Sequence, residues 1–395
     1  MKNVKICAVI CEYNPFHNGH QYLLSKIREN GATHIICIMS GNFVERCQPS
    51  LLPKDIRTKT ALMGGADLVL ELPLPYAIDT AERFAFGGAE IIKSLGCVDN
   101  IGFGCECDNC AILSQTAHIL TSDDFSNTLK KHLSSGISFA DARQKAVAEV
   151  SFECSKILEN PNNILAVEYL KQLSTTSIKP IAIKREGANH NDNHIISNTA
   201  SATFIRDNLE KPEIRCSMPE YSYELLMECL ANGNVFVDKN KFELLMLSKL
   251  RTLSIEDLTK LPNISEGLEY KLFNSIQNSA TISELFELAK SKRYSHARIR
   301  RIALCGFLGI ENGLSKLPIP YIRVLGMNKK GEEILSVAKS SCKIPISHSL
   351  KRLECENNIC KKFTQLENSS TNQYNLLLEN PKKSNSDLQF SPIKL

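Results

Sequence analysis

Two histidines three residues apart, His17 and His20, flank a glycine in the stretch CEYNPFHNGHQYLL, residues 11–24. The stretch follows the apolar run VKICAVI and precedes a helical pattern, so we expect a helix to begin near Gly19. A helix start offers free backbone N–H groups and the positive end of the helix dipole, which together favour phosphate. Histidines at this spacing share one side of the first turn, where they can donate hydrogen bonds to phosphate oxygens. Taken in isolation, the pattern equally describes a surface turn whose histidines cap a helix.

A second group of chemically suitable residues lies in SATFIR, where Ser201, Thr203 and Arg206 occupy the start of another helical pattern. Two hydroxyls, free N–H groups and a guanidinium at one helix end form a phosphate clamp. Alone this motif is weak, because Ser and Thr cap many helices and Arg is common on exposed helix faces. Paired with the histidines, it predicts a nucleotide site built from two helix starts.

These motifs need a scaffold that brings helix starts together, and the hydrophobic pattern predicts one. Short apolar runs bounded by turn residues predict buried strands at 4–10, 33–41, 67–73, 99–106 and 178–186. Amphipathic patterns predict helices at 18–29, 53–65, 79–96, 161–173 and 197–210, and two or three more between 109 and 158. Strands alternating with helices indicate an α/β fold with a Rossmann-like, doubly wound parallel sheet. Ligands bind beyond the carboxyl ends of strands in such sheets, and the histidine motif follows the first strand.

The pattern changes after about residue 215, where leucine-rich helical sequences dominate. We therefore expect an α/β nucleotide-binding domain over 1–215 and a mainly helical C-terminal region over 216–395. Within the second region, residues 321–341 predict a strand, a turn and a helix. The sequence beyond about 355 is rich in Asn, Lys and Ser, and we expect the end of this tail to be poorly ordered.

Composition is typical of a globular protein that carries no membrane segment. The 395 residues are 43% hydrophobic and 23% charged, and 47 basic against 43 acidic residues give a net charge of +4. That excess neither requires nor excludes a nucleic-acid partner, because nucleic-acid binding depends on local clusters of basic residues and not on the net charge. No apolar run approaches the roughly 18 residues of a membrane span, and we see no secretion signal, so we expect a cytoplasmic protein with no membrane partner. Oligomeric state does not follow from the sequence.

The fifteen cysteines are scattered along the chain, and we expect reduced thiols. The densest group is CECDNC, with Cys105, Cys107 and Cys110. This spacing matches no common zinc pattern and a fourth ligand is not evident, so we expect no protein-bound metal.

Nine segments occur together in an order that resembles one known family. From about residue 4 to about 340 they are EYNPFHNGHQYLL, SGNFVERCQPS, ADLVLELPLPYA, FGCE, PNNILAVEYL, IKREG, SATFIR, RYSHARIRRIAL and YIRVLGMNKKG. The set resembles the bacterial tRNA(Met) cytidine acetate ligases, whose His-x-Gly-His signature is shared with nucleotidyltransferases and class I aminoacyl-tRNA synthetases. The chain departs from the family at ERCQPS, where Gln-Arg-Gly-Glu-Pro-Ala is usual, and at FGCE, where Phe-Gly-Ser-Glu is usual.

The resemblance implies an ATP-dependent ligase. Such an enzyme activates acetate as acetyl-adenylate and transfers the acetyl group to the wobble cytidine of elongator tRNA(Met), giving N-acetylcytidine. ATP, acetate and this tRNA are then the partners, and Mg²⁺ is expected with ATP, held mostly by phosphates and water. The first step needs mainly positioning and charge stabilisation, which agrees with the lack of a serine or cysteine nucleophile motif.

The resemblance also implies the residues of the ATP site, with His17 and His20 as the catalytic pair at the phosphates. The full set is Ile10, Cys11, Glu12, Tyr13, Asn14, Pro15, Phe16, His17, Asn18, Gly19, His20, Gln21, Tyr22, Leu23, Gly104, Asn162, Asn163, Arg185, Ser201, Thr203 and Arg206. At Gly104 a side chain would block the nucleotide, and Arg185 is suited to pair with phosphate. Asn162 or Asn163 offers both a donor and an acceptor to ribose or adenine.

For the tRNA, the best local patch is the basic stretch at 291–304. Its candidate RNA-binding residues are Lys292, Arg293, Arg298, Arg300 and Arg301, with Tyr294 among them to stack on an unpaired base. An exposed basic helix face over a core stripe is the alternative. Two interpretations also remain open for Arg46, Lys54 and Arg57. They could contact phosphates or the tRNA backbone, or they could form a solvated helix face.

Two other functions fit part of the pattern. A small-molecule adenylyltransferase of the same fold would share both phosphate motifs but would not need the helical C-terminal region. A non-catalytic nucleotide- or RNA-binding module would not need the intact set of histidines, hydroxyls and arginine.

Overall fold

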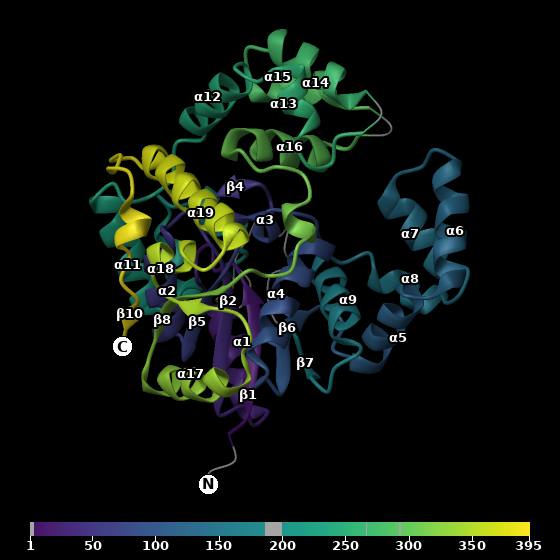
Figure 1. The fold of residues 1–395 in the computed structure, drawn as a ribbon. Coiled ribbons are helices and arrows are strands. Elements are labelled where there is room, and N and C mark those ends of the chain that lie inside the picture. Colours follow the sequence, from purple (N-terminus) through teal and green to yellow (C-terminus); the bar gives the residue numbers. More distant parts are fainter. Residues whose placement is uncertain (1–3, 186–199, 266, 292–293) are drawn as a thin grey trace.

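The computed structural model describes residues 4–185, 200–265, 267–291 and 294–395. Its centre is one sheet with the strand order β10-β8-β5-β2-β1-β6-β7, and β9 pairs with β8 (Figure 1). The parallel strands are β1 (Ile6–Cys11), β2 (His34–Ser40), β5 (Leu68–Leu72), β6 (Asn100–Cys105) and β7 (Lys179–Lys184). These are the five strands expected from the apolar runs, so the doubly wound parallel sheet is confirmed.

Alternate residues of the strands feed two separate apolar cores, because successive side chains of a strand point to opposite faces. On one face Val9 and Cys37 pack with the inward residues of α1 (Asn18–Glu29) and α2 (Lys54–Met63). On the other face the neighbouring Ala8 and Ile38 pack with α4 (Ala81–Leu95), α9 (Pro161–Leu173) and α17 (Lys329–Ser341). Burial of both faces explains why the strands read as continuous apolar runs.

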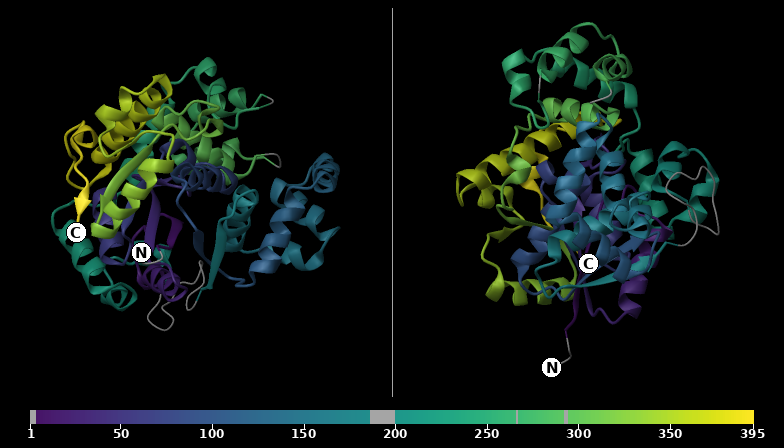
Figure 2. Two further views of the ribbon diagram at one scale, coloured as in Figure 1. Left: turned by 60° about the horizontal axis from the view of Figure 1, so that its bottom comes forward. Right: turned by 90° about the vertical axis from the view of Figure 1, so that its right-hand side faces the viewer.

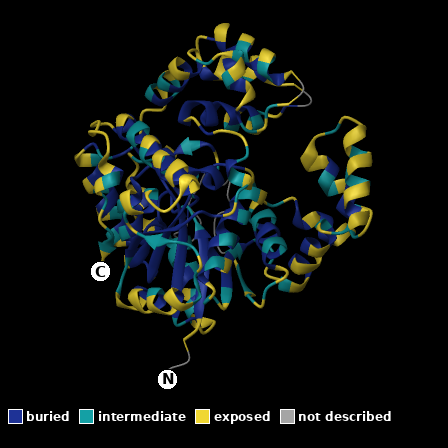
Figure 3. Ribbon diagram, in the orientation of Figure 1, coloured by how far each residue is buried: buried dark blue, intermediate teal, exposed yellow. Residues whose placement is uncertain are grey.

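Two groups of helices extend from this α/β body (Figures 1 and 2). One follows β6 and comprises four helices where two or three were expected: α5 (Cys110–Leu120), α6 (Asp123–Ser134), α7 (Phe139–Ala148) and α8 (Phe152–Ile157). The other comprises α12 (Lys239–Leu250), α13 (Ile255–Thr259), α14 (Leu268–Gln277), α15 (Ile282–Ala289) and α16 (His296–Leu308), here called the helical lobe. Figure 3 shows the central strands as buried and the outer surfaces of both groups as largely exposed, while the edge strand β7 is only partly buried.

Shorter elements complete the fold. They are β3 (Phe43–Val44), β4 (Gln48–Pro49), α3 (Leu74–Ala77), α10 (Ala202–Asp207), α11 (Glu220–Ala231), α18 (Leu350–Glu354) and the 3-10 turns at Pro212–Ser217, Leu314–Lys316 and Ser386–Gln389. β3 and β4 form an antiparallel hairpin beside the end of β2. No helix within the described ranges is both long and apolar enough to cross a membrane.

The C-terminal half departs from the expected division at residue 215, because it adds strands to the same sheet. β8 (Ile322–Met327) pairs antiparallel with β5, and β9 (Ile346–Ser347) and β10 (Ile393–Lys394) pair parallel with β8. The segment beyond residue 355, whose end we expected to be poorly ordered, contains a long helix. α19 (Asn358–Leu377) buries Phe363 and Tyr374 fully, since these residues face inward although the surrounding composition is polar.

Four buried charged side chains, here called the charge cluster, join the two halves of the chain. Lys54 Nζ lies 2.7 Å from Glu71 Oε1 and 2.7 Å from Asp387 Oδ2. Arg323 lies 2.7 Å from Glu71 Oε2 and 2.7 Å from Asp387 Oδ1. Lys54 is therefore neither a phosphate contact nor a solvated cation, because both of its partners are buried carboxylates.

Arg57 is also fully buried, and backbone carbonyl oxygens accept its hydrogen bonds. Those oxygens belong to Glu12, Ser40, Gly41 and Leu52. Arg57 thereby ties the chain segments that follow β1 and β2, and both alternatives considered for it from the sequence are wrong.

Replacing Arg323 with methionine should destabilise the protein by about 3–5 kcal/mol, because two buried carboxylates lose a partner each. Urea unfolding followed by circular dichroism measures this loss. The matched control is Lys394→Met, which removes an exposed ion pair with Glu332 and should cost less than about 1 kcal/mol. Equal stability losses in the two variants would contradict a structural role for the charge cluster.

Candidate active site

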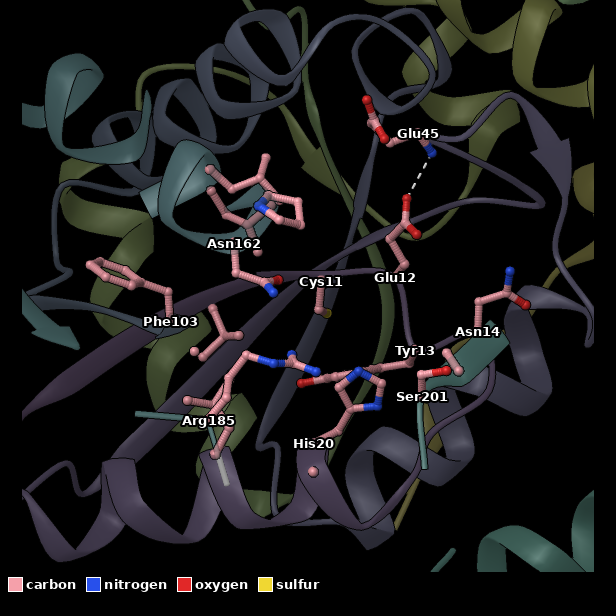
Figure 4. Close-up of a pocket in the computed structure, with 18 of the residues that line it drawn as sticks. Cys11, Glu12, Tyr13, Asn14, His20, Glu45, Phe103, Asn162, Arg185 and Ser201 are labelled. Atoms are coloured by element: carbon pink, nitrogen blue, oxygen red, sulfur yellow. Dashed lines mark hydrogen bonds between the residues drawn. The ribbon is translucent and has the colours of Figure 1, made fainter. Parts of the chain in front are cut away.

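A cavity of about 660 Å³ lies at the carboxyl ends of β1, β6 and β7 (Figure 4). β1 is the strand at which the chain order reverses, since β2 and β5 lie on one side and β6 and β7 on the other. Open parallel sheets bind ligands in the crevice at this switch point, and the volume suits a nucleotide. Residues of α1, α9 and α10 complete the walls, so the cavity joins segments far apart in the sequence.

The two histidines cap α1 and line the cavity at the same time. His17 Nδ1 accepts a hydrogen bond from the Gly19 backbone N–H at 3.1 Å, and His20 Nδ1 accepts one from the His17 backbone N–H at 3.3 Å. The imidazole rings stack with centroids 3.7 Å apart, and Tyr13 packs edge-on against His20. Helix capping and a ligand site are therefore not alternatives here, because one arrangement provides both.

Burial decides the protonation of His20. Burial lowers the pKa of His20 well below its usual range, and His17 and Arg185 lower it further. A neutral imidazole whose Nδ1 accepts a hydrogen bond carries its proton on Nε2. His20 thus offers an N–H donor to the cavity without a full positive charge, which suits an oxygen that gains charge during a reaction.

The SATFIR segment reaches the same cavity and is tied to the histidine segment. Ser201 caps α10, with its hydroxyl accepting a hydrogen bond from the Phe204 N–H at 3.0 Å. Arg206 donates to Thr203 Oγ1 at 3.0 Å and to the Asn14 carbonyl oxygen at 2.6 Å. Ser201, Thr203 and Arg206 all line the cavity, so the structure brings the two motifs together as expected.

The end of β6 supplies the third part of the site. Asn162 lines the cavity and donates to Glu106 Oε1 at 2.6 Å. Asn163 does not line it, because its Oδ1 accepts hydrogen bonds from the backbone N–H groups of Glu106 and Cys107. Of the two asparagines, Asn162 is therefore the one available to a ligand, while Asn163 holds the loop that follows β6.

Most residues expected in the site border the cavity. Those that do are Ile10, Cys11, Glu12, Tyr13, Asn14, His17, Asn18, Gly19, His20, Tyr22, Leu23, Gly104, Asn162, Arg185, Ser201, Thr203 and Arg206, and so does Arg46. Pro15, Phe16 and Gln21 do not, so the expectation of a continuous contact from Ile10 to Leu23 is too broad. Phe16 belongs instead to the core below α1, where its ring packs on Tyr13.

Sequence reasoning missed several wall residues. They are Val9, Glu45, Gln48, Ala81, Phe84, Phe103, Pro161, Ile164, Leu165, Tyr169, Ile183, Lys184 and Ala202. Most are apolar residues whose types indicate core packing alone. Tyr169 carried a usable signal, since a tyrosine on an otherwise apolar helix face needs a partner or a cavity for its hydroxyl.

Several residues of the basic stretch at 291–304, which ends in α16, have partners within the protein and are not free to contact RNA as expected. Tyr294 is buried and donates its hydroxyl to the Ser265 carbonyl oxygen, so stacking on a base is not available to it. The Arg298 guanidinium lies 4.9 Å from the Tyr294 ring centroid and donates to the Asn263 carbonyl oxygen. Arg300 is exposed, whereas Lys292 and Arg293 lie outside the described residues.

Arg301 connects the helical lobe to the cavity wall instead of facing solvent. Its Nε donates to the Ile78 carbonyl oxygen at 3.0 Å, and its Nη2 lies 3.5 Å from Glu45 Oε1. Glu45 in turn lines the cavity. The internal partners of Arg301 therefore argue against the tRNA contact expected for it.

No group of three or more His, Cys, Asp or Glu side chains is arranged to hold a metal within the described residues. In the CECDNC segment, burial raises the pKa of the Cys105 thiol to about 12, with smaller contributions from Cys107 and Cys110.

Comparisons with known proteins show which family the chain resembles over nearly its full length. Residues 4–389 match the family model described as HIGH Nucleotidyl Transferase. The chain is 37% identical over 370 residues to the tRNA(Met) cytidine acetate ligase of Clostridium tetani, covering 88% of this chain and 91% of that protein. It is 38% identical over 413 residues to the tRNA(Met) cytidine acetate ligase of Clostridium perfringens, covering 99% of each.

Solved structures match over the same extent. The structure of Thermotoga maritima TmcAL in an apo form superposes with a TM-score of 0.92 at 31% identity, covering 99% of this chain and 100% of that one. The same protein bound with alpha-thio ATP superposes with a TM-score of 0.91 and the same coverage. The fold and the histidine-lined cavity thus define a nucleotidyltransferase of the His-x-Gly-His class. Within that class, this chain belongs to the tRNA(Met) cytidine acetate ligase family.

Replacing Gly104 with valine should weaken ATP binding at least tenfold without loss of stability. A Cβ at Gly104 meets only Arg185 Cγ at 3.6 Å and the Ile183 carbonyl oxygen at 4.0 Å, so the added methyl groups extend toward the cavity. Titration calorimetry measures the affinity. The control is Gly102→Val, whose Cβ would overlap Ile27 in the core and should cost about 1–3 kcal/mol of stability. Unchanged ATP affinity in Gly104→Val would place the nucleotide elsewhere.

Proposed function

We propose that this protein uses ATP to activate acetate as acetyl-adenylate and then acetylates the wobble cytidine of elongator tRNA(Met). The observation that carries the proposal is that the stacked imidazoles of His17 and His20 line the same cavity as Arg206, at the switch point of the sheet. Arg206 is held there by its hydrogen bond to the Asn14 carbonyl oxygen. The near full-length similarity to TmcAL bound with alpha-thio ATP supports the same reading.

In the first step the acetate oxygen attacks the α-phosphorus of ATP and pyrophosphate leaves. This chain contributes donors around the phosphates, namely the imidazoles of His17 and His20 and the side chain of Arg185, beside the positive end of the α1 dipole. Such donors stabilise the charge that develops on phosphate oxygens, and because they are fixed by packing they need no rearrangement. A neutral His20 fits this role since it donates a hydrogen bond without exchanging a proton with the reactants.

Mg²⁺ would accompany ATP and be held mostly by phosphates and water. The carboxylates of the cavity wall, Glu12 and Glu45, do not form a ligand set of their own. A metal would supply charge neutralisation at the leaving pyrophosphate.

The tRNA would lie across the helical lobe and the mouth of the cavity. Arg300 supports this placement because it is an exposed cation on α16, next to Arg301, which contacts the cavity wall. We therefore place the RNA-binding surface mainly in the region after residue 215, with the nucleotide site before it. A small-molecule adenylyltransferase would share the cavity and leave this surface unused.

The sharpest test of the proposed function is isotope exchange between pyrophosphate and ATP. We expect exchange that depends on acetate, with and without tRNA, and loss of that exchange by about 100-fold or more in His20→Asn, since one oxyanion donor is worth about that factor. His118→Ala is the matched control, because this histidine is exposed and outside the cavity. Exchange supported only by a different acid would rule out acetate as the substrate.

A second experiment addresses the tRNA surface. Arg300→Ala should weaken tRNA binding and lower the salt dependence of that binding by about one counterion, because one phosphate contact is lost. Acetate-dependent exchange should not change. Lys351→Ala on α18 is the control for removing an exposed cation elsewhere. Equal effects of both variants on tRNA affinity would mean that the helical lobe does not carry the RNA.

A further inference from the structure

The cavity has two chemically different ends. Figure 4 shows His20 and Arg185 together at one side and Glu12 beside Glu45 at another. His20 and Arg185 can donate hydrogen bonds to phosphate oxygens, whereas a carboxylate oxygen can accept one from an N–H group. The side with Glu12 therefore offers a hydrogen-bond acceptor to an amine, even though Arg206 lies near the same carboxylate.

Glu12 has one carboxylate oxygen fixed and one available. It follows the last residue of β1, and its Oε1 accepts a hydrogen bond from the Glu45 backbone N–H at 2.7 Å. Within the described residues, Glu12 Oε2 has no hydrogen-bond partner although the side chain borders the cavity. One fixed oxygen orients the other, as a proton acceptor requires.

Tyr169 adds a hydroxyl group to the cavity lining that includes Glu12 and Glu45. Its residue is only 4% exposed, it lines the cavity from α9, and its hydroxyl makes no hydrogen bond within the described ranges. Cys11, Glu12 and Glu45 are its electrostatic neighbours. A hydroxyl that borders a cavity without a protein partner can form a hydrogen bond to a polar ligand there.

We propose that Glu12 is a catalytic residue of the second step, taking the proton that the cytosine amine loses when it attacks the acetyl group. The inference rests on the proposed function, since it needs an acetyl-adenylate and an amine acceptor. The amine nitrogen forms a bond to the acetyl carbon, and the bond from that carbon to the phosphate oxygen breaks. The electron pair leaves with AMP, and the amine proton moves to Glu12 Oε2.

The surroundings of Glu12 set its proton affinity near neutrality. Burial raises the pKa of Glu12 to about 7, and the charge of Glu45 adds to this, while the Glu45 N–H, Arg206 and Arg57 act in the opposite direction. Tyr169 on α9 is a further titratable group that interacts electrostatically with this carboxyl. A base of this pKa is matched to proton transfer at neutral pH. Only the ionised form accepts a proton, so transfer should rise as pH increases through about 7.

The test separates the two half-reactions in the full-length enzyme. Acetyl-adenylate is formed on the enzyme from ATP and labelled acetate, a tRNA(Met) transcript is added, and single-turnover transfer is measured from pH 6 to 8; pyrophosphate exchange is measured without tRNA. In Glu12→Gln, transfer should fall by about 10²–10⁴-fold and lose its rise with pH. The fall in transfer should exceed any fall in exchange at least tenfold.

Two further variants sharpen the result. Glu12→Asp should keep the pH-dependent rise at a reduced rate, and Glu45→Gln should lose less transfer than Glu12→Gln. Equal losses of exchange and transfer in Glu12→Gln, or transfer at the wild-type rate, would overturn the role of Glu12. A wild-type enzyme without acetate-dependent exchange would instead overturn the proposed function, so the two failures are distinguishable.

Discussion

The charge cluster is the constraint on which the arrangement of the chain depends. Two cations and two carboxylates are each buried, and such groups are tolerated only when every partner is present. Lys54 and Glu71 come from the first third of the chain, whereas Arg323 and Asp387 come from its last quarter. The nucleotide-binding sheet therefore cannot reach its final packing until the C-terminal segment has returned to it.

The C-terminal segment also places a third carboxyl group, that of Glu367, next to the charge cluster. Glu367 of α19 accepts a hydrogen bond from the Leu74 backbone N–H, and burial, together with Glu71, raises its pKa to about 8. Glu367 is thus mostly protonated at neutral pH, which leaves two positive and two negative charges in the cluster. Burial opposes ionisation of Asp387, but Lys54 and Arg323 lower its pKa well below the usual range. The charges balance within one buried volume, and α2, β5, β8 and α19 are held around it.

Local patterns predicted the elements well, because buried parallel strands and amphipathic helices carry their signal in consecutive residues. The pattern at 161–173 matches α9, and the helix expected from Gly19 or its neighbour begins at Asn18. The membership of β8 in the sheet was not predictable, because antiparallel pairing with β5 is a long-range contact that leaves no local mark. The same holds for α19, whose core residues are spaced among Asn, Lys and Ser.

The candidate site shows the same limit at the level of single side chains. Residue type identified His17, His20, Ser201 and Arg206, since their chemistry and spacing are unusual at helix starts. Type alone misjudged Lys54, Arg57 and Arg301, because a cation in a sequence gives no indication of whether carboxylates or carbonyl oxygens surround it. Tyr169 was missed because it lies among apolar residues of its helix, and the sequence does not show that this helix face borders a cavity.

A chain of contacts connects the helical lobe to the acidic end of the cavity. Arg301 on α16 reaches Glu45, and the Glu45 backbone N–H fixes Glu12. Glu45 lies in the turn between β3 and β4, so this turn is held from two sides. An RNA that rests on the helical lobe would therefore meet the cavity on the side of Glu45 and Glu12. With Glu12 in the role proposed above, acetate would be activated beside His17 and His20, and the amine would arrive at a carboxylate already oriented by the Glu45 backbone.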